Sequence, residues 1–337
     1  MRLVEKAQSL DAQGQLAELE KTAWRLIDEY PASPWGYLFL GRNALFRGQM
    51  RAALGWFRQG LARPDRSDGA AAHCLFGAFD ALFMLREYQD ALLMFRANIN
   101  MNVSEPEVRE RRFLAEIGNY AERGDLAPLF LALGDDQATT PTIWLWDPFF
   151  ERLTADLLRK DRIDDAAATA RAYLRINPAS ASAWYSLALA EWSAKRNEAG
   201  FAAFARAESL AGDRAGWGPR YLLAGNIAAQ LEDIDRQIEF YEKALRLGYR
   251  TPLLLNNLAW GYYLANKNTE IALTFSQESV RLNPDDAPSL DTLARLQNRV
   301  GEKDEALRNI NRAIELSLFD PYVEDMRAFR RELTGGQ

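Results

Sequence analysis

The residue types that most often carry covalent catalysis are scarce in this chain. It has one histidine, His73, and one cysteine, Cys74, and the two are adjacent. A cysteine nucleophile needs an imidazole within hydrogen-bonding reach. On a helix, adjacent side chains point about 100° apart, because the helix has 3.6 residues per turn. The pair therefore predicts no Cys–His nucleophile, we assign no catalytic residue, and we expect Cys74 to be a packing residue.

Metal and cofactor chemistry is not indicated either. Cysteine and histidine are too few for a zinc site, and the sequence has no Gly-rich phosphate loop or dinucleotide-binding fingerprint. Paired acids occur at 135–136, 164–165 and 285–286, where turns or helix starts are expected. Carboxylates at such places cap helices and interact with the helix dipole. The sequence therefore predicts no metal site, no cofactor and no enzymatic activity.

The bulk composition is that of a folded acidic protein. Of its 337 residues, 48% are hydrophobic and 26% charged, and the net charge is −6 with a pI near 5.2. No nucleic acid partner is expected at this charge. No apolar run is long enough for a membrane span, and the first residues lack the apolar stretch of a signal peptide. We expect a cytoplasmic protein; a periplasmic or envelope-associated location is the alternative if a signal peptide was removed.

The elements that would position a binding residue follow a repeat of 34 to 38 residues. A mostly small residue is followed, four positions later, by a mostly large one. The first set is Ala53, Ala91, Leu129, Ala166, Gly200, Gln237, Ala272 and Ala306. The second set is Phe57, Phe95, Leu133, Ala170, Phe204, Tyr241, Ser276 and Ile310. Self-similarity at this period indicates a solenoid of stacked helix pairs.

The clearest unit contains Trp184, Leu187, Ala188, Gly200 and Phe204. Trp184 and Leu187 form one stripe of a helix with Glu191, and the small residues Ala188 and Gly200 let the two helices of the pair approach closely. This unit resembles the tetratricopeptide repeat, and nearly the whole chain is similar to that pattern. The resemblance implies an all-α, right-handed superhelical solenoid of about nine helix-turn-helix repeats, with a terminal helix near 322–333.

A later unit has Asn256, Ala259, Trp260 and Tyr263 at the packing positions of its first helix and Ala272 in its second. The phrase from residue 255 to 260 is also similar to bacterial tetratricopeptide-repeat proteins of the cell envelope. Those proteins take part in exopolysaccharide export and in outer-membrane assembly or reception. The resemblance therefore implies a bacterial protein.

The repeat pattern weakens between Asn102 and Pro148. This predicts two arms, an N-terminal one of residues 1–140 with a degenerate last repeat and a C-terminal one of residues 141–337. The segment 144–150 is unusually aromatic. It is either a wedge between repeats or an exposed surface for a partner or a homo-oligomer. A second break, at 212–219, predicts a longer loop.

The resemblance also implies which side chains meet a ligand, because the first helices of tetratricopeptide repeats line a concave groove. The matching positions are Trp35, Leu38, Arg42, Phe46, His73, Phe76, Asp80, Tyr185, Trp192, Asn226, Gln230, Asn257, Arg295 and Arg299. The three amides would bond an extended peptide backbone. Arg295 and Arg299 would bind a carboxylate, or, in the alternative, Arg295 pairs with Asp291 on its own helix.

These features predict a non-catalytic scaffold or adaptor. Its partner would be a protein or peptide segment bound in the groove. This prediction rests on the helical repeat together with the lack of a catalytic residue pattern in the sequence. The alternative is the repeat region of a bacterial envelope system, for exopolysaccharide export, outer-membrane assembly or reception.

Overall fold

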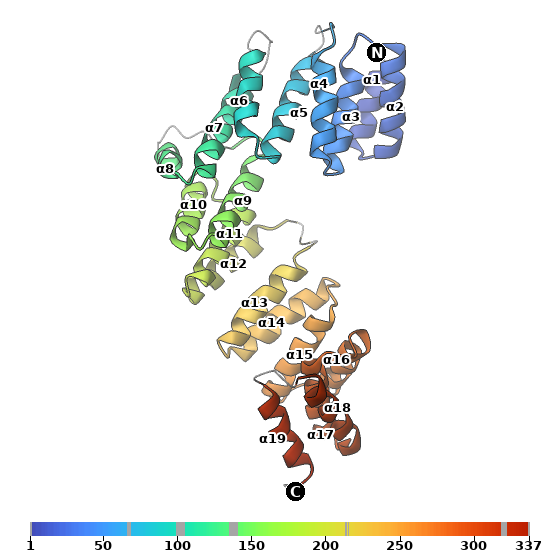
Figure 1. Cartoon of the computed structure of the whole chain (residues 1–337), viewed down its shortest axis with the longest axis vertical. Coiled ribbons are helices and arrows are strands. Elements are labelled where there is room, and N and C mark those ends of the chain that lie inside the picture. Colours follow the sequence, from blue (N-terminus) through green and yellow to red (C-terminus); the bar gives the residue numbers. More distant parts are fainter. Residues whose placement is uncertain are drawn as a thin grey trace. The chain divides into compact units, whose positions relative to one another are not determined.

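The computed structural model of the chain describes residues 2–65, 69–98, 105–134, 141–212, 214, 216–317 and 322–335. Within these ranges the regular elements are nineteen α-helices, and no strand occurs. The chain divides into two compact units, Met1–Leu210 and Ala211–Gln337. Figure 1 labels the helices of both units. The all-α fold predicted from the sequence is confirmed.

Unit 1 consists of six consecutive helix pairs, and most second helices also pack on the first helix of the next pair. The pairs are α1 (Arg2–Ala12) with α2 (Leu16–Glu29), α3 (Trp35–Phe46) with α4 (Met50–Leu61), α5 (Ala70–Met84) with α6 (Tyr88–Ala97), α7 (Glu105–Glu122) with α8 (Ala127–Gly134), α9 (Trp146–Arg159) with α10 (Ile163–Ile176), and α11 (Ala181–Ser193) with α12 (Asn197–Leu210).

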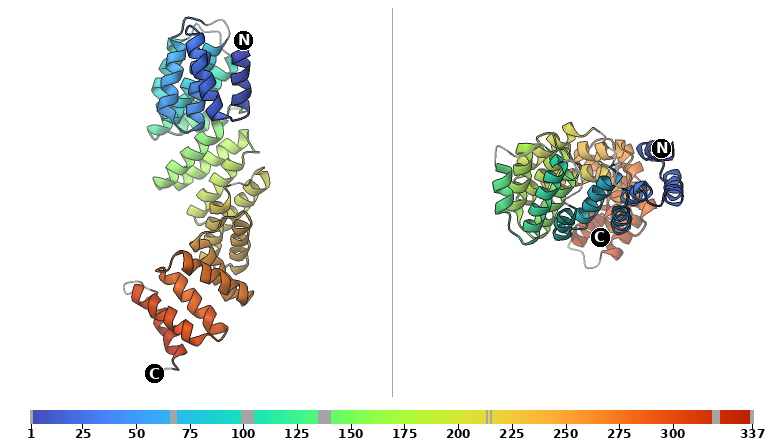
Figure 2. Two further views of the ribbon diagram at one scale, coloured as in Figure 1. Left: turned by 90° about the vertical axis from the view of Figure 1, so that its right-hand side faces the viewer. Right: turned by 90° about the horizontal axis from the view of Figure 1, so that it is seen from above.

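Unit 2 consists of three further pairs and a terminal helix. They are α13 (Gly218–Gln230) with α14 (Ile234–Arg246), α15 (Pro252–Ala265) with α16 (Thr269–Leu282), α17 (Ala287–Arg299) with α18 (Lys303–Leu316), and α19 (Val323–Leu333). Figure 2 shows these orange and red helices stacked side by side. Helix α19 covers the last pair with Val323, Met326 and Phe329. Nine pairs and a terminal helix were predicted, and the structure has them.

A small residue facing a large one explains why the helices of a pair lie so close. Phe57 is fully buried, and a Cβ atom on Gly41 would lie 2.4 Å from its ring. In unit 2, a Cβ atom on Gly225 would lie 2.3 Å from the ring of Tyr241. Both distances are far below van der Waals contact, so only glycine lets the ring of the second helix lie on the backbone of the first.

Of the four predicted packing residues of α15, Asn256 and Ala259 are buried, whereas Trp260 and Tyr263 are not. This helix has 14 residues, whereas α13 and α17 have 13 each, and two left-handed asparagines follow in its hairpin turn. Counted from the start of the helix, the buried stripe Leu255, Leu258 and Tyr262 has the same positions as the stripes of α13 and α17, and the extra residue lies between this stripe and α16. Trp260 and Tyr263 are therefore half-buried instead of packed between the two helices of the pair.

The aromatic segment 144–150 leads into α9 and is mostly buried. Trp146, Phe149 and Phe150 are at most 3% exposed, and the ring of Phe150 lies parallel to that of Tyr173 with 4.2 Å between their centroids. Trp144 is the one aromatic side chain of the segment that is largely exposed, at 52%. The segment is thus a wedge inside unit 1, and a homo-oligomer formed through it stays a prediction.

Helix α9 also reaches past the fourth pair to the third. The rings of Phe149 and Phe83 lie 5.4 Å apart. Arg152 donates hydrogen bonds to the carbonyl of Met84 at 3.3 Å and to the hydroxyl of Tyr88 at 3.1 Å. The fourth pair therefore does not fully separate its neighbours, and it lies where the repeat pattern weakens in the sequence.

The division into units falls at the second predicted break. Helix α12 ends at Leu210 and α13 begins at Gly218, so the predicted break lies between these two helices. The predicted arms 1–140 and 141–337 meet beside residues 135–140, which lie outside the described residues, so that division stays a prediction. No helix in the described ranges combines the length and the apolar character that crossing a membrane requires.

Candidate functional site

On α3, the four predicted ligand-binding residues have different environments. Leu38 is 3% exposed, and Arg42 forms an ion pair with Asp11 of α1 at 2.7 Å. Trp35 is half-buried, whereas Phe46 is 64% exposed at the end of the helix. The structure thus leaves Phe46, part of Trp35 and part of the ion-paired Arg42 accessible to a ligand, whereas Leu38 is buried inside the unit.

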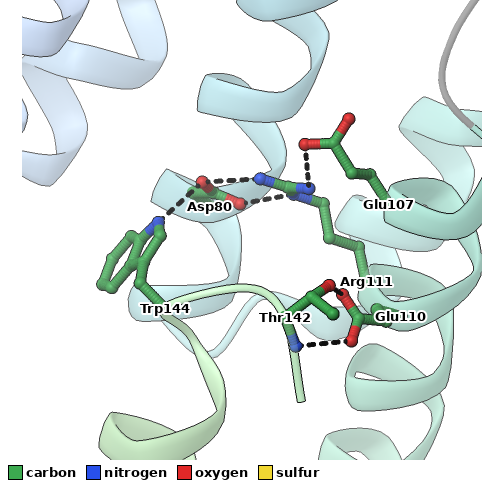
Figure 3. Close-up of polar contacts among 6 residues, drawn as sticks. All are labelled: Asp80, Glu107, Glu110, Arg111, Thr142 and Trp144. Carbon is green, nitrogen blue, oxygen red and sulfur yellow. Dashed lines mark hydrogen bonds and ion pairs between the residues drawn. The ribbon is translucent and has the colours of Figure 1, made fainter. Parts of the chain in front are cut away.

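On α5, Asp80 is the centre of a buried polar cluster, which Figure 3 shows. Arg111 of α7 donates from Nε to Oδ1 at 2.8 Å and from Nη2 to Oδ2 at 3.2 Å. The indole Nε1 of Trp144 donates to Oδ2 at 3.3 Å. The side chains of Arg111 and Asp80 are 6% and 8% exposed. The Asp80 carboxylate is therefore occupied by Arg111 and Trp144 of the same chain in this structure, whereas the prediction placed it in an open groove.

The electrostatics of this cluster are dominated by burial. Desolvation raises the pKa of the Asp80 carboxyl, while Arg111 and Trp144 act in the opposite direction. The Arg111 guanidinium also lies 4.5 Å from the ring centre of Phe76, a predicted ligand contact that is buried beneath it. Among the described residues Nη1 of Arg111 has no hydrogen-bond partner, and the nearest carboxylate, that of Glu107, is 3.9 Å away.

A second carboxylate of α7 holds the segment that precedes α9. Glu110, which is 3% exposed, accepts hydrogen bonds from the backbone N–H of Thr142 at 2.9 Å and from its hydroxyl. Thr142 itself is exposed. Residues 142–144 thus lie across α5 and α7 (Figure 3). His73, also predicted as a ligand contact on α5, is exposed and does not take part in this cluster.

On α11, one of the two predicted aromatic contacts is used for packing. Trp192 is 4% exposed, and its ring lies 5.4 Å from that of Phe201 and 5.6 Å from that of Phe204, both on α12. Tyr185 is half-buried. Trp192 therefore faces the second helix of its pair and cannot meet a ligand in this structure, whereas part of Tyr185 can.

In unit 2, two predicted amides meet on neighbouring first helices. Asn226 of α13 accepts hydrogen bonds from the hydroxyl of Tyr241 at 2.7 Å and from Nδ2 of Asn257 on α15 at 3.1 Å. Gln237 of α14 donates to the backbone carbonyl of Asn257 at 3.3 Å, which explains a glutamine where the repeat usually has a small residue. Gln230, one turn after Asn226, is exposed.

The buried end of this network is rigid. Tyr241 is 1% exposed, and burial raises its pKa to about 12, although its hydrogen bond with Asn257 acts in the opposite direction. Its hydroxyl reaches Asn226 because Gly225 leaves room for the ring. The amides on the first-helix face are thus held in place from inside the helix pair.

Two aromatic residues of α15 extend the same face. The rings of Trp260 and Tyr263 stack with 5.1 Å between centroids. Arg299 of α17 lies 3.8 Å from the ring centre of Tyr263 and donates to its carbonyl at 2.8 Å. Arg299 is exposed, and its other N–H groups bond to none of the described residues. We call the side chains of this surface the unit 2 face: Asn226, Gln230, Asn257, Trp260, Tyr263 and Arg299.

Arg295 is already paired within unit 2. Its Nε lies 2.9 Å from Asp291 and its Nη2 lies 2.6 Å from Asp325 of α19. Its side chain is 11% exposed. The alternative in which Arg295 pairs with Asp291 is therefore confirmed, and of the two predicted arginines Arg299 is the one that remains accessible.

Sequence reasoning missed four contributors to these sites. Trp260 and Tyr263 were assigned to packing because the extra residue in α15 shifts the repeat pattern by one. The available signal was that Tyr262 stands next to Tyr263 and could take the packing position instead. Arg111 and Trp144 lie 31 and 64 residues from Asp80, in the part of the chain where the repeat pattern fails. In the described ranges, no group of three or more His, Cys, Asp and Glu side chains is arranged to hold a metal ion.

Comparison with known proteins gives one match at the level of sequence families: the tetratricopeptide repeat, over residues 219–247. No curated protein matches the chain in sequence. Solved structures similar to it include YrrB, a tetratricopeptide-repeat protein with an unusual peptide-binding site, at 13% identity and a TM-score of 0.47, covering 53% of this chain and 91% of that one.

Two further structures are similar at the same level. PilW, a type IV pilus biogenesis factor, has 17% identity and a TM-score of 0.46, with 58% of this chain and 88% of that chain covered. MamA from Desulfovibrio magneticus RS-1 has 13% identity and a TM-score of 0.44, with 52% and 97% covered. These likenesses concern the arrangement of helices and carry no information on a ligand.

Proposed function

Because the chain is a tetratricopeptide-repeat protein, we propose that it is a non-catalytic adaptor that binds an extended segment of a partner protein on the unit 2 face. Such repeats form an interaction scaffold, and their first helices present side chains that the packing of the pair does not use. We also propose a cytoplasmic location, which suits a chain with a single cysteine.

The observation that carries this proposal is the preorganised amide pair. Asn226 and Asn257 bridge α13 and α15 at 3.1 Å, and Tyr241 fixes the first of them from inside. Both are half-buried, so each keeps a side toward solvent. Side chains that are already held in place lose little conformational entropy when a ligand binds. An amide offers both a donor and an acceptor, as a peptide backbone does.

The neighbouring side chains indicate the chemistry of the bound segment. Trp260 and Tyr263 supply apolar ring surface next to the amides. Arg299 supplies a guanidinium with unused donors, which favours a carboxylate. The proposed segment has an apolar side chain against the accessible edges of these two stacked rings and an acidic side chain or a C-terminal carboxylate at Arg299.

Selection of peptides on the full-length chain tests the proposal. A random peptide library is selected against the protein, and the affinity of the recovered peptides is measured by calorimetry. We expect extended peptides with an apolar and an acidic residue. Trp260→Ala and Arg299→Ala should each weaken binding about tenfold, the loss of one good contact.

The matched controls are Trp24→Ala, an exposed tryptophan of unit 1, and Arg308→Ala, an exposed arginine on the second helix α18. Neither should change the affinity. Recovered peptides that bind all four variants as tightly as the unchanged protein would show that the unit 2 face is not the binding surface. The envelope alternative stays a prediction, and none of the described contacts favours it.

A further inference from the structure

We propose that the face formed by α5 and α7 in unit 1 is a second peptide-binding surface, occupied in this structure by residues 142–144 of the same chain. Its external ligand is an extended segment with a hydroxyl residue and, two positions later, a tryptophan. This surface is in unit 1 and does not depend on the function proposed for the unit 2 face.

The contacts of residues 142–144 are those of a bound peptide. One carboxylate, that of Glu110, receives both the backbone N–H and the hydroxyl of Thr142. Another, that of Asp80, receives the indole N–H of Trp144 at 3.3 Å. The two carboxylates belong to consecutive first helices, as Figure 3 shows. The two carboxylates thus bind one backbone group and two side chains of the segment, and recognition of extended peptides combines backbone and side-chain contacts in this way.

The occupying segment is held loosely enough to be displaced. Thr142 is exposed and Trp144 is 52% exposed, so water reaches both residues and competes for their hydrogen bonds. The residues that follow are different, because Leu145 and Trp146 are 0% and 3% exposed and anchor the start of α9. Residues 142–144 are therefore able to leave the face while the wedge that follows them stays in place.

The segment is also an incomplete ligand. Nη1 of Arg111 is buried and, within the described part of the chain, has no hydrogen-bond acceptor; the Glu107 carboxylate is 3.9 Å away. A buried donor without an acceptor is unfavourable. Residues 142–144 supply no acceptor to this donor, whose ion-pair partner among the described residues is Glu107.

Fluorescence anisotropy with a labelled, capped peptide tests this proposal. The peptide has the sequence of residues 141–145, Pro-Thr-Ile-Trp-Leu. It is titrated with the full-length protein, with the double variant Thr142→Val/Trp144→Ala, and with Trp24→Ala, whose tryptophan is similarly exposed at 45%. We expect the double variant to bind roughly tenfold more tightly than the unchanged protein, because an occupied face lowers the binding-competent fraction. Trp24→Ala should bind as the unchanged protein does.

Two further arms locate the site. Adding Glu110→Gln to the double variant should weaken peptide binding about tenfold, since the charged acceptor is lost. A peptide with valine and alanine in place of its threonine and tryptophan should not bind. Circular dichroism establishes that each variant keeps its helices, and the single variant Trp144→Ala serves if the double variant does not. A folded variant that binds the peptide no better than the unchanged protein overturns the proposal and makes residues 142–144 a permanent brace.

Discussion

Removing the carboxylate of Asp80 should destabilise unit 1 strongly. Asp80→Ala deletes both hydrogen bonds to Arg111, at 2.8 and 3.2 Å, and leaves a guanidinium that is 6% exposed with only the Glu107 carboxylate, 3.9 Å away, as a counter-ion. Such a charge cannot return to water without opening the packing of α5 against α7. The stability loss therefore comes mainly from the arginine that remains, and only partly from the bond that is broken.

The magnitude follows from which of two opposing effects dominates. Two charges about 3 Å apart attract each other by roughly 5 kcal/mol at an effective dielectric constant near 20. Desolvation offsets much of this, and the raised pKa of Asp80 shows that burial is the larger influence on the carboxyl. The intact pair thus stabilises little. Stranding one partner of a buried pair nevertheless costs about 3 to 5 kcal/mol, whereas replacing both by apolar residues of similar volume is often neutral.

Urea unfolding followed by circular dichroism measures the effect, and hydrogen exchange with mass spectrometry assigns it to α5 and α7. We expect Asp80→Ala to lower the free energy of unfolding by about 3 kcal/mol or more, and Asp80→Leu/Arg111→Met to recover most of that loss. Glu18→Ala is the control, because the Lys21–Glu18 pair has the same 2.8 Å separation but side chains that are 73% and 53% exposed. It should cause no resolvable change. If Asp80→Ala is as stable as this control, the argument from stranded charge is wrong.

Two further predictions concern unfolding of the pairs themselves. Gly225→Ala should lower the free energy of unfolding by about 1 to 3 kcal/mol, because its Cβ would lie 2.3 Å from the ring of Tyr241. Gly55 is a helical glycine with nothing within 4 Å of the added Cβ atom. Gly55→Ala should therefore raise the free energy of unfolding by up to about 1 kcal/mol. Equal effects of the two substitutions in urea titrations would contradict the packing argument. Tyr241 has a folded pKa of about 12 against an ordinary value of 10. Its unfolded form therefore ionises first, so stability should be unchanged below pH 10 and fall between pH 10 and 12. Tyr241→Phe should lose less stability over that interval in urea titrations at several pH values, and an identical loss would refute the assignment.

The sequence predicted the parts of the fold that depend on local spacing. A small residue facing a large one recurs at a fixed period because each pair must bury the same contact, and so nine pairs and the terminal helix follow from residues such as Ala53 and Phe57. The buried state of both is confirmed. The amides Asn226 and Asn257 were also placed correctly on first helices, although their bond to each other and to Tyr241 was not anticipated.

The rest depends on departures from the period, which spacing alone does not reveal. One extra residue separates the buried stripe of α15 from Ala272, so Trp260 and Tyr263 match packing positions in the sequence but are half-buried in the structure. The partners of Asp80 come from a degenerate pair and from a non-helical segment. A carboxylate at a predicted groove position therefore looks accessible in the sequence and is buried in the structure.

The buried and the accessible positions of the first helices have separable roles. Arg42, Asp80, Asn226 and Arg295 lie at equivalent places in their repeats, and each is bonded to another part of its own unit. Of these four, Asp80 is buried, Asn226 and Arg295 are half-buried and Arg42 is exposed, but each side chain connects neighbouring helices whatever else it does. Substituting them changes stability and binding together. Arg299 also contacts a neighbouring helix through Tyr263, but it is exposed and keeps N–H groups for a ligand, so its substitution should affect binding more than stability. A set of variants that includes both helix-connecting and ligand-accessible residues therefore distinguishes the loss of a binding surface from the loss of stability.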